Sequence, residues 1–243
     1  SGLTINSGSL EASGGGSSSE LKTDDGTTAM EVRDGTSGAN VIGGTKQTTK
    51  GFPSQATISG GASNRVGADG ATIGGGGVNK ATSDDATVAG GEENIASGNK
   101  SSIGRGSKNK ATASNTAIGG GTSNEATKAD ATVAGGRANK ADGKQSAIGG
   151  GESNKTSAEY STIAGGRNNE TTSGLYTTVA GGADNTAGGD YSSITGGNGN
   201  TANGENSVVV GGKNNVAAGD NSFAAGRLAK TKNKAGRKEG AFV

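Results

Sequence analysis

A repeat of 15 residues constrains this chain more than any other feature of its sequence. The segments 56–70, 71–85 and 86–100 align without gaps, and a looser turn precedes them at Ala39. Further turns begin at Ser101, Thr116, Ala131, Ser146, Ser161, Thr177, Ser192 and Ser207, with one inserted residue in the turn 161–176, and a degenerate turn follows at Ser222. One fixed period is typical of a solenoid, in which each repeat contacts only its neighbours.

The third position of each turn forms a column of β-branched residues. Its members are Ile58, Ile73, Val88, Ile103, Ile118, Val133, Ile148, Ile163, Val179, Ile194 and Val209. Parallel strands stacked in register produce such a column, because each strand lies about 4.8 Å from its equivalent in the next turn. We therefore expect the stacked isoleucines and valines to fill a narrow interior.

Two further columns indicate where each turn bends. The fifth and sixth positions are glycine in all eleven turns, apart from Arg105 at one fifth position, which predicts corners with a positive φ or a close backbone approach. The ninth position is asparagine throughout: Asn64, Asn79, Asn94, Asn109, Asn124, Asn139, Asn154, Asn169, Asn185, Asn200 and Asn215. Stacked asparagines can hydrogen-bond along the column, and asparagine also tolerates the left-handed conformation of a turn.

Composition favours short strands and glycine turns over other fold classes. Hydrophobic residues make up 28% and aromatic residues 2% of the 243 residues, which is too little for a conventional globular core. A net charge of +1 and a single proline argue against disorder. A helical fold fails because paired glycines recur in almost every turn and no apolar stripe of helical period exists. We predict an all-β chain, folded as a single-stranded parallel β-roll or β-solenoid.

The predicted core is thin. Each turn supplies one β-branched side chain and one or two alanines, which offset less free energy than the ordering of 15 residues costs. Association of several chains is the simplest remedy. We expect positions one and two of each turn, such as Ala56-Thr57 and Ser161-Thr162, to point outward and to form a flat face that packs against a copy of the chain.

The residue types that are missing exclude most catalytic chemistry. The sequence has no cysteine and no histidine, which removes disulfides, thiolate and imidazole metal sites, and catalysis by Ser-His-Asp or Cys-His groups. We expect no catalytic, cofactor-binding or metal-binding residues, and we interpret the protein as not an enzyme. The balance of 23 basic and 22 acidic residues does not call for nucleic acid as a partner. No run approaches the roughly 20 apolar residues that membrane insertion requires.

Turns such as 207–221 (SVVVGGKNNVAAGDN) and 192–206 (SSITGGNGNTANGEN) resemble the head repeats of YadA-like trimeric autotransporter adhesins. Similar repeats are found in trimeric phage tail fibres. The resemblance covers residue 39 to about residue 230, and it implies a left-handed parallel β-roll, three copies of which pack around an axis as a homotrimer. The family's usual SxAxG-rich turns are replaced here by IxGGxxNxA turns.

The repeat also divides the chain into regions. Residues 1–38 do not follow it and read as an N-terminal cap or connector, with short strands at 20–23 and 29–33 around an Asp-Asp-Gly turn. Residues 39–221 form the solenoid head. Residues 222–243 read as a basic neck or terminal cap that leads into a further C-terminal segment, and the resemblance implies that this neck ties three chains together. Its basic residues are Arg227, Lys230, Lys232, Lys234, Arg237 and Lys238.

The only three tyrosines, Tyr160, Tyr176 and Tyr191, occupy the last position of three successive turns. We therefore expect them to stack as a ladder on the surface. One interpretation is that ring stacking simply stabilises the column. The other is a contact patch for a sugar or a protein, because exposed aromatic residues are enriched at interfaces.

These observations lead to a functional hypothesis that rests on the resemblance. The protein is interpreted as a non-catalytic fibre or adhesin head, in a bacterial trimeric adhesin or a phage tail fibre, that gives rigid reach and multivalent attachment. Its partners would be further copies of itself and a protein or glycan receptor on a cell surface or in the extracellular matrix. Its location would be extracellular, on a cell surface or on a virion. The alternatives are a filament subunit that stacks end to end, and an ice- or polymer-binding solenoid that uses a partial threonine column, Thr57, Thr72, Thr87, Thr132, Thr162 and Thr178.

Overall fold

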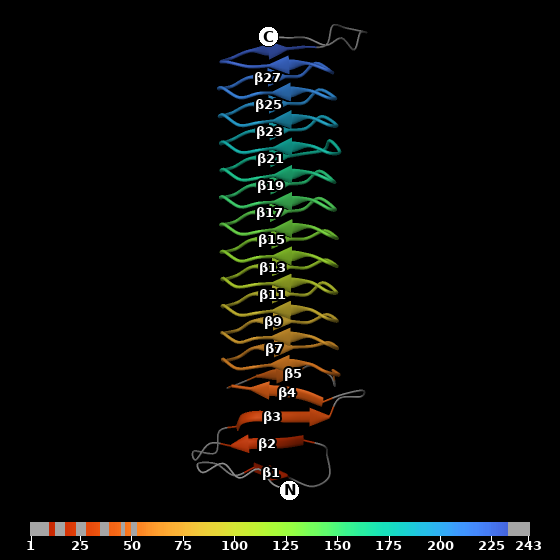
Figure 1. Ribbon diagram of the computed structural model, residues 1–243, viewed down its shortest axis with the longest axis vertical. Helices are drawn as coiled ribbons and strands as arrows, with labels where there is room; N and C mark the ends of the chain where they lie inside the picture. The colour runs from red at the N-terminus through yellow and green to blue at the C-terminus, as the bar shows by residue number, and fades with distance from the viewer. Residues whose placement is uncertain are drawn as a thin grey trace. The chain divides into compact units, whose positions relative to one another are not determined.

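The computed structural model describes residues 10–12, 18–22, 28–34, 39–44, 47–49 and 53–232. Within these ranges the fold is all-β, without a helix, and parallel strands stack as a β-solenoid of about 12 turns. The chain divides into two compact units, an N-terminal unit of Ser1–Asn115 and a C-terminal unit of Thr116–Val243. Both units are built from the same kind of turn, which has two short strands (Figure 1).

In the N-terminal unit each solenoid turn gives one strand to each of two sheets. The first sheet contains β4 (Ala39–Gly43), β6 (Thr57–Ile58), β8 (Thr72–Ile73), β10 (Thr87–Val88) and β12 (Ser102–Ile103). The second sheet contains β5 (Thr48–Thr49), β7 (Arg65–Val66), β9 (Lys80–Ala81), β11 (Ile95–Ala96) and β13 (Lys110–Ala111). Three antiparallel strands precede them: β1 (Leu10–Ala12), β2 (Ser18–Lys22) and β3 (Thr28–Asp34), of which β3 pairs with β4.

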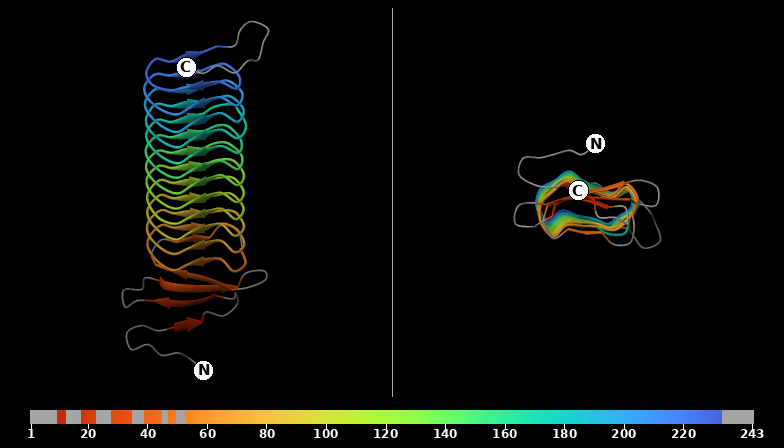
Figure 2. Two further views of the ribbon diagram at one scale, coloured as in Figure 1. Left: turned by 45° about the horizontal axis from the view of Figure 1, so that its top comes forward. Right: turned by 90° about the horizontal axis from the view of Figure 1, so that it is seen from below.

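The C-terminal unit repeats this arrangement. Its first sheet contains β14 (Ala117–Ile118), β16 (Thr132–Val133), β18 (Ala147–Ile148), β20 (Thr162–Ile163), β22 (Thr178–Val179), β24 (Ser193–Ile194), β26 (Val208–Val209) and β28 (Phe223–Ala224). Its second sheet contains β15 (Glu125–Ala126), β17 (Lys140–Ala141), β19 (Lys155–Thr156), β21 (Glu170–Thr171), β23 (Thr186–Ala187), β25 (Thr201–Ala202), β27 (Val216–Ala217) and β29 (Lys230–Thr231). Seen end-on, each turn is a narrow loop with its strands on opposite long sides (Figure 2).

The predicted strands before the repeat are confirmed in part. β2 and β3 cover most of the two expected ranges and pair antiparallel, whereas β1 was not predicted. The Asp-Asp-Gly turn between β2 and β3 lies outside the described residues. Because β3 pairs antiparallel with β4, and β4 pairs in parallel with β6, the first sheet changes its strand direction at this point.

Equivalent strands pair in parallel with a shift of one turn, as the repeat predicts. In the C-terminal unit Ile148 lies beside Ile163. The longer turn 161–176 keeps this register, because Ile163 still pairs with Val179. The extra residue is Ser173, which is exposed after the end of β21, so it lengthens one edge of the turn without shifting a strand.

Positions one, three, nine and eleven are buried in every full turn, and position thirteen is buried in several of them. In the turn 146–160 the residues at one, three, nine and eleven are Ser146, Ile148, Asn154 and Thr156, none of which is more than 1% exposed. Both sheets thus contribute alternate residues to a common interior, as the two-residue period of a strand requires. The predicted β-branched column is confirmed as part of this core, since all eleven of its members are buried.

The expected orientation of position one was wrong. Ala56 and Ser161 are fully buried, while position two, at Thr57 and Thr162, is turned toward solvent. The reason is strand alternation: residues one and three share a side of the strand, so a buried third residue places the first residue inside as well. The outward face of the first sheet therefore consists of positions two and four.

The asparagine column is a buried ladder of hydrogen bonds, as predicted, and all eleven of its members are 0% exposed. The Oδ1 atom of Asn139 accepts the backbone N–H of Asn154 at 3.0 Å. Its Nδ2 donates to the carbonyls of Gly135 and Gly151, at 2.9 Å each. Each asparagine thereby connects its own corner to the corner of the following turn.

The asparagines do not themselves adopt the left-handed conformation that the sequence allowed. The residue before the asparagine adopts it, for example Ser153 with φ 56°, and so does the last residue of the turn, for example Tyr160 with φ 55°. In this conformation the backbone N–H of Ser153 donates to the carbonyl of Arg137 in the preceding turn at 2.9 Å. In the looser turn of the N-terminal unit Gln47 replaces the asparagine, and its Oε1 accepts the N–H of Asn64 at 2.8 Å.

The two glycines of the corner have different roles. At the sixth position Gly136 has a φ of 89°, and a Cβ atom there would overlap the carbonyl oxygen of Gly151 in the next turn. At the fifth position Gly135 has no neighbour within 4 Å of such a Cβ atom. This difference explains why the fifth position accepts Arg105, whereas the sixth is glycine in every turn.

Positions one and eleven face each other across the core. Thr156 Oγ1 donates to Ser146 Oγ at 2.8 Å, and Ser146 Oγ donates to the carbonyl of Gly143 at 2.7 Å. Other turns combine a hydroxyl at position one with an alanine at position eleven. In four of these turns the buried hydroxyl has no hydrogen-bond partner: Ser101, Thr177, Ser192 and Ser207.

Replacement of Ser192 by alanine should raise the free energy of unfolding by up to about 1 kcal/mol, because it removes a buried hydroxyl that makes no hydrogen bond. The matched variant Ser146→Ala should lower it by about 1–2 kcal/mol, because Thr156 loses its acceptor. Urea unfolding followed by far-UV circular dichroism measures both effects. A loss of stability in the Ser192 variant would contradict this reasoning.

Candidate functional site

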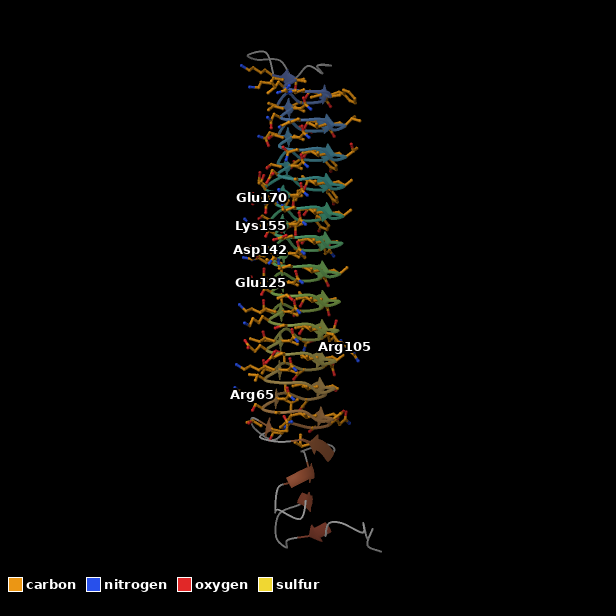
Figure 3. The ribbon with its side chains drawn as sticks, turned by 90° about the vertical axis from the view of Figure 1, so that its left-hand side faces the viewer. Arg65, Arg105, Glu125, Asp142, Lys155 and Glu170 are labelled. Carbon is orange, nitrogen blue, oxygen red and sulfur yellow. The ribbon has the colours of Figure 1, made fainter. Side chains whose placement is uncertain are left out.

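The two sheets of the C-terminal unit present different outer faces. Over residues 116–232, positions two and four of the first sheet carry only small, aliphatic or aromatic side chains and no charge. The second sheet carries charges of both signs, and Glu125, Asp142, Lys155 and Glu170 lie on the same side in Figure 3. Lys155 Nζ lies 2.9 Å from Glu170 Oε1. A charged face and an uncharged face thus lie back to back.

The three tyrosines form the predicted ladder at one edge of this unit. The ring centroids of Tyr160 and Tyr176 are 4.9 Å apart with an interplanar angle of 15°, and those of Tyr176 and Tyr191 are 5.2 Å apart with an angle of 9°. The three residues are 38%, 47% and 56% exposed. Ring stacking is confirmed, while a role as a contact patch stays a prediction.

Backbone geometry fixes the ladder. Each tyrosine has a φ between 55° and 58°, so its N–H is directed at the preceding turn. The N–H of Tyr160 donates to the carbonyl of Lys144 at 3.0 Å, and that of Tyr191 to the carbonyl of Leu175 at 2.8 Å. A left-handed conformation costs a residue other than glycine about 1 kcal/mol or more. Regular bonding to the turn below offsets this cost and gives every ring the same direction.

The tyrosine edge is also where apolar surface gathers. Leu175, next to Tyr176, is 39% exposed, and its N–H donates to Asp190 Oδ1 at 2.9 Å. Among residues 116–232 the exposed large hydrophobic side chains are Tyr160, Leu175, Tyr176, Tyr191, Val210 and Leu228, so four of six lie at this edge. In a chain this poor in hydrophobic residues, such a concentration is typical of an interaction surface.

A shallow hollow of about 350 Å³ adjoins the ladder on the side of the preceding turns. Its lining includes Lys128, Ala129, Asp142, Gly143, Lys144 and Glu159. Ala129 leaves room because its side chain is only a methyl group. Tyr160 does not line the hollow, but the lining residue Glu159 directly precedes it in the chain.

Asp142, at one wall of the hollow, is held as a carboxylate. Burial by itself raises the pKa of this carboxyl group, but hydrogen bonds from Thr127 and Lys140 and the positive charges of Lys140 and Lys128 together lower its pKa below the ordinary value of an aspartate. Lys140 Nζ lies 3.3 Å from Asp142 Oδ2. The charge of Asp142 is therefore already compensated by its neighbours.

The sequence did not predict the hollow, although one of its lining residues, Lys128, departs from the repeat pattern. Position thirteen is small in the other turns of the repeat, and Lys128 is its only charged occupant. Of the predicted neck, Arg227, Lys230 and Lys232 are exposed after the last full turn. Lys234, Arg237 and Lys238 lie outside the described residues.

Searches for other kinds of site and for relatives add no further candidate. The described residues contain no group of three acidic, cysteine or histidine side chains placed to hold a metal ion. In the same part of the chain, no helix has the length and apolar character needed to cross a membrane. No protein-family model matches the sequence, and no curated protein matches it.

Proposed function

We propose that this protein is a non-catalytic extracellular scaffold of the fibre or adhesin-head type, which binds a cell-surface or matrix receptor through its tyrosine edge. The observation that carries the proposal is the ladder of Tyr160, Tyr176 and Tyr191, half exposed on a regular solenoid and accompanied by Leu175. Hydrogen bonds between successive turns hold the rings in place, so binding would cost little side-chain entropy.

Self-association would place several copies of the tyrosine edge on one particle. The outer face of the first sheet, around Thr162 and Thr178, is uncharged and flat, so a copy of the chain could cover it without desolvating charges. Three copies joined through this face would form the homotrimer that the resemblance to adhesin heads and tail fibres implies. Three weak sites on one rigid particle gain avidity without any new contact.

Two alternative functions have some structural basis. In the N-terminal unit the outer face of the first sheet carries Thr57, Thr72 and Thr87, which favours an ice- or polymer-binding surface as a second candidate. An end-to-end filament is less well supported. Antiparallel strands β1–β3 extend the first sheet of that unit, so this edge does not offer the parallel register that a stacked copy would continue.

Two measurements test the proposal: the mass of the chain in solution and the attachment of chain-coated beads to cells. Light scattering on the purified chain should give a mass near three times 23.1 kDa. Beads coated with the chain should attach to bacterial or cultured animal cells, and substitution of Tyr160, Tyr176 and Tyr191 by serine should reduce attachment at least about tenfold, because interface aromatics carry much of the binding energy.

The matched control replaces Glu125, Lys155 and Glu170 on the second sheet by glutamine and should leave attachment unchanged. Full attachment by the serine variant would refute the tyrosine edge as the binding surface. A stable monomer would refute the trimer, and a monomer that also depresses the freezing point of water would favour the ice-binding alternative.

A further inference from the structure

We propose that the hollow beside Tyr160 is a subsite for a sugar that carries a carboxylate, such as a uronic acid or a sialic acid. The inference rests on the proposed receptor-binding function and specifies its ligand. Three observations converge on it: an exposed tyrosine directly after a lining residue, two lysines that form no ion pair, and a shallow hollow that both lysines line.

The aromatic face follows from the order of the ladder. Tyr176 has a ring on each side, whereas Tyr160 has a tyrosine on one side only. The equivalent position of the preceding turn holds Gln145, so the second face of the Tyr160 ring is directed at the turn whose Asp142 and Lys144 line the hollow, and the residue is 38% exposed. The C–H groups on one side of a pyranose are weakly positive and apolar, which suits the negative face of a phenol ring.

The charges of the hollow favour an anion. Lys140 forms an ion pair with Asp142, and the positive charge of Lys128 also acts on this carboxylate. Within the described part of the chain, Lys128 and Lys144 form no ion pair and no side-chain hydrogen bond. Together with Lys140, the lining carries three ammonium groups against the two carboxylates of Asp142 and Glu159. Lysine binds carboxylates through charge-assisted hydrogen bonds, while Glu159 remains available to accept hydrogen bonds from sugar hydroxyls.

Departure from the repeat supports a dedicated site. Lys128 stands at position thirteen, where the equivalent residues Gly143 and Ala158 are buried, and it is instead exposed. The neighbouring Ala129 stands in a column that otherwise holds mostly charged or polar residues, and its small side chain opens the hollow. Such local breaks in an otherwise consistent pattern are expected at functional positions.

The chain supplies its own optical probe. It contains no tryptophan and three tyrosines, all in the ladder, so intrinsic fluorescence excited at the tyrosine band reports on this edge alone. The probes are a hyaluronan octasaccharide, which carries glucuronate, and 3′-sialyllactose, with the carboxyl-reduced octasaccharide as the neutral counterpart. Titration of the full chain should show saturable binding of at least one acidic probe, weakened by salt, and at least about tenfold weaker binding of the reduced sugar.

Matched variants locate the subsite. Lys144→Gln should weaken binding at least about tenfold, whereas Lys155→Gln on the second sheet should not change it. Tyr160→Ala should abolish binding while Tyr191→Ala, at the far end of the ladder, should retain it. Binding to glucuronate alone identifies a uronic-acid polymer as the source, and binding to sialyllactose alone identifies a sialylated glycan.

Three outcomes overturn the inference: no binding of either acidic probe, equal binding of the reduced sugar, or equal loss in the Tyr160 and Tyr191 variants. These outcomes are distinguishable from a failure of the proposed function. If cell attachment depends on the tyrosines but neither acidic sugar binds, only the sugar subsite is wrong. If the sugars bind but attachment is unaffected by the serine variant, the subsite stands and the proposed function falls.

Discussion

Replacement of Gly136 by alanine should lower the free energy of unfolding by at least about 3 kcal/mol, because the added methyl group can be accommodated only if the backbone of the next turn shifts. The Cβ atom would overlap the carbonyl oxygen of Gly151 and lie 2.6 Å from Asn139 Nδ2. The φ of 89° adds strain, since residues other than glycine rarely adopt it. Urea unfolding followed by far-UV circular dichroism measures the loss.

The control is the adjacent residue. Gly135→Ala places a Cβ atom with nothing within 4 Å and should change the free energy of unfolding by less than about 1 kcal/mol. The two variants have the same composition and differ by one position in the chain. Equal stability of the two would show that the turns are not stacked as closely as the structure has them.

Replacement of Asn139 by alanine should cost about 3 kcal/mol or more, because one substitution removes three side-chain hydrogen bonds from a buried corner. The N–H of Asn154 loses its acceptor, and the carbonyls of Gly135 and Gly151 lose their donor. Aspartate has the same shape but would direct a second oxygen at the two carbonyls, so Asn139→Asp should be similarly harmful at neutral pH.

An exposed asparagine provides the comparison. Asn203→Ala, beside β25, should alter the free energy of unfolding by less than about 0.5 kcal/mol, as surface substitutions usually do. Thermal unfolding of the Asn139 and Asn203 variants, recorded together, gives the difference directly. A small loss at Asn139 would mean that water replaces its partners and that the column does not stabilise the stack.

Much of this fold could be predicted because successive turns of a solenoid repeat one backbone geometry and therefore one sequence pattern. Columns such as Ile148 and Asn154 predict parallel stacking, and Tyr160 predicts the ladder, since equivalent residues of successive turns must be neighbours. The predicted orientation of position one was wrong because each column of equivalent residues was considered by itself. The two-residue period of strands ties Ser146 to Ile148, and applying it would have placed both inside.

The features that the sequence did not reveal depend on contacts between different columns. The second sheet requires that residues such as Thr156 face the first sheet across the core, which no single column indicates. The hollow depends on Lys128, Lys144 and Glu159, from three successive turns, lying together at one edge, and only the folded turns bring them there. Lys128 could nevertheless have been noticed as a break in its column.

The additional residue Ser173 has a consequence for how such a chain can change. It enlarges one edge of its turn while Ile163 and Val179 remain paired. A longer loop at that edge therefore does not change the register of the strands. The sixth-position corner has no such freedom, because neighbouring backbones touch there. Variation can therefore accumulate beside the tyrosines without refolding the rest, and a foreign peptide epitope inserted between Ser173 and Gly174 would be displayed outward on a scaffold that keeps its register.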